Sequence, residues 1–153
     1  MNFNSNNSDF NKTLAPWIGR TEKLINIHIS DVFLHNNIQV TKEQWIVLKI
    51  LYEDNDNLIQ NELAFITNRN KASLTRLINV MEKNKLVARI PSKKDSRKNL
   101  IQITETGKLL FLKMKPLMLN TLEMLQNGIT EDEKEVFINV MTKIQTNLKN
   151  HTI

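Results

Sequence analysis

Stretches in which apolar side chains recur every three or four residues alternate with short polar stretches along the chain. That spacing places the apolar side chains on one face of an α-helix. It predicts helices over about 14–34, 41–53, 60–66, 71–83, 104–127 and 130–148. The pattern therefore indicates a mainly helical protein with a hydrophobic core.

Polar residues stand at the expected ends of several of these helices. The segments Thr41–Gln44 and Thr130–Glu133 each read as a capping box, in which a Thr and an acidic or amide side chain three residues later bind the free amides of the first turn. Asn70 is placed to cap the helix that follows it. Asn84 is predicted to end that helix in the left-handed conformation, which Asn tolerates better than most residues, and Gly128 is predicted to end the fifth helix.

Two short strands are predicted between the fourth and fifth helices, at Leu86–Ile90 and Leu100–Thr104. Pro91 limits the first strand, because Pro cannot donate a hydrogen bond to a sheet. The segment that joins the strands, residues 92–99, is polar throughout. We therefore expect a β-hairpin with an exposed tip, and a fold class that is mainly α with this small hairpin.

The composition excludes several classes of protein. Residues 1–12 are rich in Asn and Ser, which predicts a disordered tail without the apolar segment of a signal peptide. Apolar runs are at most about four residues long, far below the roughly 20 that span a bilayer. The chain has no Cys, so it forms no disulfide and has no thiol chemistry. These features predict a cytoplasmic protein that does not enter a membrane.

The charge of the chain is concentrated in one segment. Residues 69–98 contain ten basic and two acidic side chains, a net charge of +8, whereas the whole chain carries +5. The segments before and after this block are therefore acidic or neutral in balance. A basic block of this density is typical of a surface that binds a polyanion.

The order of elements around the basic block gives it a geometry. Two short helices, a polar turn, a basic helix and a hairpin with a basic tip are the parts of a winged helix-turn-helix, whose second helix enters the major groove of DNA. Residues at the start of that helix are the candidate base readers: Asn70, Lys71, Ser73, Thr75 and Arg76. Candidates for the DNA backbone and the minor groove flank it: Arg69, Lys93, Lys94, Arg97 and Lys98. Asp95 is predicted to hold the guanidinium of Arg97 in one orientation.

The same residues resemble the MarR family of multiple antibiotic resistance regulators. The resemblance rests on Leu63–Ala64, Ser73–Ile78, Met81–Lys83, Leu86–Val87, Arg89, the Asp95–Arg97 wing and Ile103–Thr104 with Gly107. One position departs from it, because Lys85 stands where the family usually has Gly before the Leu-Val pair. We expect Asn84 to make the turn in its place.

The resemblance implies a homodimeric regulator, expected to be a repressor, that binds an inverted repeat in double-stranded DNA. Residues 38–104 would form the winged helix-turn-helix lobe, and residues 13–37 and 105–149 a helical dimerisation lobe. It also implies a small, often anionic aromatic effector between the lobes, for which Trp17, Arg20, His28 and Trp45 are the candidate contacts.

Other interpretations of the residues stay open at this point. The basic block is also compatible with an RNA-binding face or with a non-specific, architectural DNA-binding protein. His28 and His35 lie seven residues apart on one predicted helix face, but no further ligands accompany them, so no metal site is predicted. An enzyme remains the least favoured class, because the sequence contains no Gly-rich phosphate loop and no recognisable set of catalytic residues. No cofactor is expected.

Overall fold

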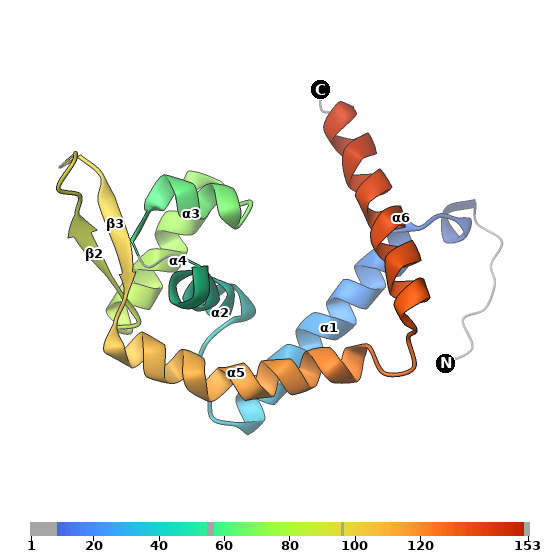
Figure 1. The fold of residues 1–153 in the computed structure, drawn as a ribbon, viewed down its shortest axis with the longest axis horizontal. Coiled ribbons are helices and arrows are strands. Elements are labelled where there is room, and N and C mark those ends of the chain that lie inside the picture. Colours follow the sequence, from blue (N-terminus) through green and yellow to red (C-terminus); the bar gives the residue numbers. More distant parts are fainter. Residues whose placement is uncertain (1–8, 55–56, 96, 152–153) are drawn as a thin grey trace. The chain divides into compact units, whose positions relative to one another are not determined.

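The structure is a computed structural model that describes residues 9–54, 57–95 and 97–151 (Figure 1). Most of the predicted disordered tail, residues 1–8, lies outside the described residues. The last part of that segment, Asp9–Lys12, forms a 3-10 helix.

The predicted helices and the hairpin are present, which confirms the mainly α fold class with a β-hairpin wing. The helices are α1 Ala15–His35, α2 Lys42–Lys49, α3 Gln60–Ile66, α4 Lys71–Lys83, α5 Glu105–Leu125 and α6 Glu131–Asn150. The strands are β1 Leu58–Ile59, β2 Val87–Pro91 and β3 Asn99–Ile103. Two features differ from the sequence prediction. The second helix has the predicted extent, but its last part, Ile50–Asp54, is π-helical, and β1 is an additional strand.

The three strands form one antiparallel sheet in the order β1-β3-β2. Leu58 of β1 pairs with Ile101 of β3, and Arg89 of β2 pairs with the other side of the same residue. A strand of two residues is too short to show an alternating pattern in the sequence, so the apolar periodicity does not predict β1. Because β2 and β1 are the edge strands, each offers one row of backbone groups that the sheet does not bind.

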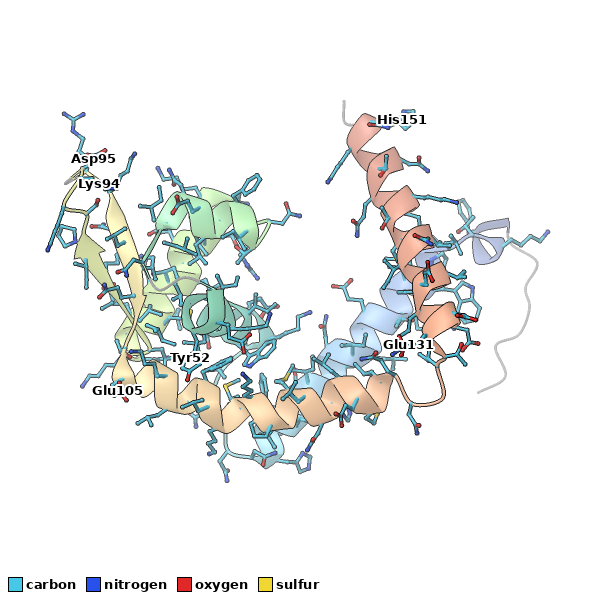
Figure 2. All side chains as sticks on the ribbon, viewed as in Figure 1. Tyr52, Lys94, Asp95, Glu105, Glu131 and His151 are labelled. Atoms are coloured by element: carbon cyan, nitrogen blue, oxygen red, sulfur yellow. The ribbon has the colours of Figure 1, made fainter. Side chains whose placement is uncertain are left out.

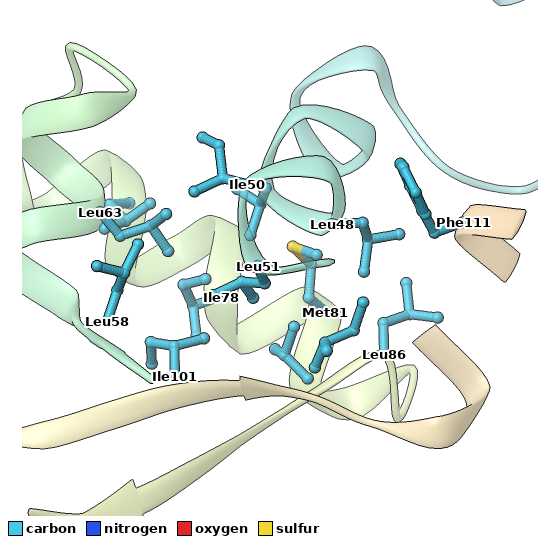
Figure 3. Close-up of a cluster of buried hydrophobic side chains, with 14 residues drawn as sticks. Leu48, Ile50, Leu51, Leu58, Leu63, Ile78, Met81, Leu86, Ile101 and Phe111 are labelled. Carbon is cyan, nitrogen blue, oxygen red and sulfur yellow. The ribbon is translucent and has the colours of Figure 1, made fainter. Parts of the chain in front are cut away.

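The main core lies where α2, α3 and α4 pack against the sheet and the start of α5 (Figure 3). Leu48, Leu63, Ile78 and Ile101 are fully buried there, and Phe111 of α5 closes one side. Full burial of a side chain of this size stabilises the fold by roughly 1.5–3 kcal/mol. This core fixes α4 against the wing, which is the part of the fold that presents the basic block.

A second, smaller core joins α1 to α5. It contains Ile29, Phe33 and Ile38 from the first helix and its exit, with Met114 and Met118 from the fifth. The two cores belong to one compact unit, which extends to Met118.

The chain from Leu119 onward forms a separate compact unit that contains α6. Its helix begins as predicted, since the Thr130 hydroxyl accepts a hydrogen bond from the Glu133 amide and the Glu133 carboxylate accepts one from the Thr130 amide. The sequence predicts that Val136, Phe137 and Leu148 point inward, but all three are more than 60% exposed in this chain. None of the α6 side chains is buried, so the apolar face of this helix is exposed in the single chain.

The end of α4 corrects one sequence prediction. Asn84 has an ordinary backbone (φ −83°), whereas Lys85 adopts the left-handed conformation with φ 58°. The Lys85 amide donates to the carbonyl of Glu82, and the Leu86 amide donates to that of Met81, both at 2.9 Å. These two bonds form a Schellman motif, which requires the left-handed residue one position later than we predicted.

Candidate nucleic-acid interface

Local capping sets the position of the basic helix α4. The preceding helix α3 ends with Asn68 in the left-handed conformation (φ 51°), and the amide of Arg69 donates to the carbonyl of Ala64 at 2.9 Å. Asn70 then caps α4 as predicted, because its Oδ1 accepts from the Ser73 amide at 2.8 Å. A turn of four residues therefore connects the two helices and exposes the first turn of α4.

The predicted base readers differ in how free their side chains are. Lys71 and Arg76 are exposed on α4. Ser73 is half-buried and accepts a hydrogen bond from the Arg69 guanidinium (3.0 Å). The Thr75 hydroxyl donates to the carbonyl of Lys71 (2.8 Å) and accepts from the side-chain amide of Gln60 (2.7 Å). Thr75 thus uses most of its hydrogen-bonding capacity within the protein.

The loop at the end of the hairpin is held by its own polar groups. The Ser92 amide donates to the carbonyl of Lys98, and the Lys98 amide donates to the carbonyl of Asp95, both at 2.9 Å. The Ser92 hydroxyl accepts from the Lys94 amide at 3.2 Å. Figure 2 shows Lys94 and Asp95 at the far end of the β2–β3 hairpin, directed away from the core. Lys93, Lys94 and Arg97 are exposed there.

The contact that we predicted between Asp95 and Arg97 takes a different form. The Asp95 carboxylate accepts a hydrogen bond from the backbone amide of Arg97 (3.1 Å), and its charged partner among the described residues is Lys98 (3.7 Å). A carboxylate two residues before an amide forms this Asx-type turn easily. Asp95 therefore shapes the loop through the Arg97 backbone and pairs with Lys98.

The wing and the start of α4 meet at a concave surface of about 260 Å³. Its cationic lining residues are Lys71 of α4 and Arg97 and Lys98 of the wing. The remaining lining residues are Ile59, Gln60, Asn61 and Asn99. Among the described residues, three cations and no acidic side chain line it, which favours an anion such as a phosphate. Sequence reasoning missed Gln60, Asn61 and Asn99, because only the fold brings the start of α3 beside the wing.

Two of the four residues predicted to contact an effector, Trp17 and Arg20, lie side by side on α1. The Arg20 guanidinium lies over the Trp17 ring at 5.6 Å from its centroid, and Trp17 is 61% exposed. His28 follows Trp17 by eleven residues on α1, a rise of about 16 Å along a helix. Trp45 is partly buried and packs against both cores, and its buried indole nitrogen has no hydrogen-bond partner in the part of the chain that the structure describes.

Ionisable groups near the interface show one shifted titration. Burial of the Glu43 carboxyl acts to raise its pKa, but hydrogen bonds from its own backbone amide and the Thr41 hydroxyl, with the charge of Arg69, outweigh it and lower the pKa. Glu43 therefore stays ionised at neutral pH.

In the described ranges no cluster of His, Cys, Asp and Glu has the arrangement of a metal site. No helix in those ranges is long and apolar enough to cross a membrane.

Comparisons with known proteins agree with this arrangement. The sequence model of the MarR family matches residues 38–98, which include α2, α3, α4 and strand β2 of the wing. This match identifies residues 38–98 as a MarR-family domain. The structure resembles the DNA complex of MepR from S. aureus, with 23% identity and a TM-score of 0.81 over 89% of this chain and 98% of the other.

Two further solved structures share the fold of this chain. A mutant of MarR from E. coli in complex with operator DNA has 18% identity and a TM-score of 0.77 over 86% of this chain and 92% of the other. BpsR of Bordetella bronchiseptica, whose DNA binding is regulated by 6-hydroxynicotinic acid, has 18% identity and a TM-score of 0.80 over 90% and 96%.

Proposed function

We propose that this MarR-family protein binds double-stranded DNA in a sequence-specific manner and regulates transcription in the cytoplasm as a repressor. The observation that carries the proposal is the joint lining of one concave, cationic surface by the start of α4 and by the wing. A helix start placed in the major groove and a wing beside it would bind the two sides of one stretch of backbone. The solved complexes of MepR and MarR with DNA support the same kind of partner.

We propose further that the protein acts as a homodimer. The apolar face of α6 supports this, because Val136 and Phe137 are exposed in the single chain and a second copy would cover them. A dimer with two-fold symmetry would bind an inverted repeat, with half-site centres about 10 bp apart or a multiple of that spacing. Sedimentation as a monomer at micromolar concentration would contradict the dimer.

The experiment that tests sequence specificity is selection of bound duplexes from random DNA at physiological salt. If the proposal is right, the selected duplexes share a sequence motif with two-fold symmetry. Equal binding to selected and scrambled duplexes would instead support the non-specific architectural alternative. Turnover of a substrate by protein that binds no DNA would support an enzyme.

Variants of the helix and the wing separate base reading from backbone binding. Arg76→Ala is expected to cost about 1–3 kcal/mol on the selected site and to relax specificity at one position per half-site. Lys93→Ala and Lys94→Ala are expected to weaken binding about equally on all sequences, with the salt slope lowered by about one for each phosphate that is no longer bound. Arg97→Ala is expected to matter most where A/T-rich flanks narrow the minor groove. Unchanged affinity in both Arg76→Ala and Arg97→Ala would refute the proposed roles.

A small aromatic anion is the effector class that we propose for release from DNA. The regulation of BpsR by 6-hydroxynicotinic acid supports this class. The Trp17–Arg20 pair offers an exposed ring and a cation side by side, which is a suitable surface for an aromatic carboxylate. Titration of such compounds with tryptophan fluorescence as the readout tests it, using Trp17→Phe to assign the signal. A flat response across a broad panel contradicts it.

A further inference from the structure

A polar network joins the wing to the DNA-facing helix, and Arg89 is at its centre. Arg89 lies on β2 and its side chain is 19% exposed. Its Nη1 donates to Glu82 Oε2 (2.5 Å) and its Nη2 to Asn79 Oδ1 (2.7 Å), both on α4. Its Nε donates to Gln60 Oε1 at the start of α3 (3.4 Å). One planar guanidinium on a strand of the wing therefore binds two helices.

The network also occupies a backbone group of the sheet edge. Because β2 is an edge strand and Arg89 pairs with Ile101 on its inner side, the Arg89 amide is available on the outer side, where it donates to Glu82 Oε1 at 3.3 Å. Glu82 thus accepts from both the backbone and the side chain of Arg89. A carboxylate held by two donors fixes the direction of the strand relative to the helix more tightly than a single ion pair would.

The network continues to the candidate DNA surface through Gln60. The Gln60 amide binds Arg89 through its oxygen and Thr75 through its nitrogen, and Gln60 also lines the cationic concave surface. Thr75 in turn donates to the carbonyl of Lys71, whose side chain lines the same surface. A chain of bonds therefore runs from the wing strand to the first turn of α4.

We propose that Arg89 is a positioning residue that sets the spacing between the wing and α4, and so the spacing between Arg97 and the base-reading turn. Its charge is compensated by Glu82 and its fork is used within the protein, so it acts through Arg97 without binding phosphate itself. The inference rests on the proposed DNA-binding function. It assigns to Arg89, Glu82 and Gln60 a role distinct from that of the exposed cations.

Two substitutions give outcomes that charge alone does not produce. Arg89→Lys keeps the charge, but one ammonium cannot reproduce the fork that reaches three acceptors. Glu82→Gln raises the net charge by one, which by electrostatics alone strengthens DNA binding. Positioning predicts that both variants bind the selected site more weakly, on the order of tenfold, or about 1.4 kcal/mol, with an unchanged salt slope. Glu105→Gln, in the first turn of α5, is the charge-matched control and is expected to bind as tightly as the wild type or more tightly.

A double-mutant cycle identifies the group through which Arg89 acts. If it positions the wing, Arg89→Lys is expected to have little further effect in the Arg97→Ala background, because the guanidinium that it positions is already absent. Additive effects would overturn the proposal, as would wild-type affinity in Arg89→Lys. A reduced salt slope in Arg89→Lys would show a direct interaction with phosphate instead, with Lys93→Ala as the reference for such an interaction.

A measurement without DNA separates failure of this inference from failure of the proposed function. Hydrogen exchange of the residue 89 amide is expected to be at least several-fold faster in Glu82→Gln than in the wild type, whereas the Leu74 amide within α4 is expected to be unchanged. Absence of specific DNA binding in the wild type, together with this exchange result, would refute the function and leave the network intact. An unchanged rate at residue 89 would refute the network itself.

Discussion

Lys85 is the position at which the structure makes its most specific prediction about stability. A side chain with a Cβ in the left-handed conformation is destabilised by about 1–2 kcal/mol relative to the ordinary helical region. Gly avoids this cost but loses more backbone entropy on folding, by roughly 0.5–1 kcal/mol. We therefore expect Lys85→Gly, at φ 58°, to raise the free energy of unfolding by about 0.5–1 kcal/mol.

The neighbouring residue provides the matched control. Asn84 has φ −83° and ψ 6°, so Gly relieves no strain there and only the entropic cost remains. Asn84→Gly is thus expected to lower the free energy of unfolding by about 0.5–1 kcal/mol. Lys85→Gln, which removes the charge near the helix end but keeps the Cβ, is expected to change stability by less than about 0.5 kcal/mol.

Urea unfolding at one fixed protein concentration measures these differences, because the stability of the proposed dimer would depend on concentration. The midpoint is expected to move in opposite directions for Lys85→Gly and Asn84→Gly, with an unchanged m-value. For a chain of this length, about 1 kcal/mol corresponds to a shift of about 2–4 °C in Tm. If Asn84→Gly stabilises the protein and Lys85→Gly does not, the left-handed residue is Asn84 and our account of the helix end is refuted.

Three further predictions concern other sites. Gly107→Ala is expected to destabilise the protein by about 1–3 kcal/mol, because a Cβ there would lie 2.2 Å from the Leu86 carbonyl oxygen. Gly19→Ala is the control and is expected to stabilise α1 by up to about 1 kcal/mol, because no atom lies within 4 Å of the new Cβ. Equal effects of the two substitutions in thermal unfolding would contradict this. Asn68→Gly is expected to stabilise less than Lys85→Gly, because Asn tolerates the left-handed conformation (φ 51°); a larger gain by the same urea assay would show that the residue type is unimportant. Hydrogen bonds from the backbone amide and hydroxyl of Thr130 lower the pKa of the Glu133 carboxyl in the folded state, so the ionised carboxyl stabilises the fold above its unfolded pKa and this stabilisation disappears as the pH falls through the folded pKa. Circular dichroism during acid titration is expected to show a weaker acid dependence of stability in Glu133→Gln than in the wild type. Identical curves would contradict this role of Glu133.

The sequence by itself determined the local elements of this protein. Apolar periodicity located the helices, and side chains that bind backbone groups a few residues away, such as Thr41, Asn70 and Thr130, marked where helices begin. These signals are readable because capping and periodicity depend on neighbours within about four residues. The concentration of basic residues was equally visible, because charge needs no fold to be counted.

Tertiary structure alone decided how those elements meet. Asn84 is the better left-handed residue by intrinsic preference, yet Lys85 takes that conformation, since burial of Leu86 beside Met81 in the core sets where the chain must turn. The hydrogen bonds from Arg89 to Glu82, Asn79 and Gln60 join residues up to 29 positions apart, and no local sequence pattern predicts such partners. Asp95 is a local case: its carboxylate accepts from the backbone amide of Arg97, whereas the sequence suggested the guanidinium of the same residue as its partner. Local physics therefore defined the parts of the candidate DNA-binding surface, and packing over long sequence separations defined its geometry.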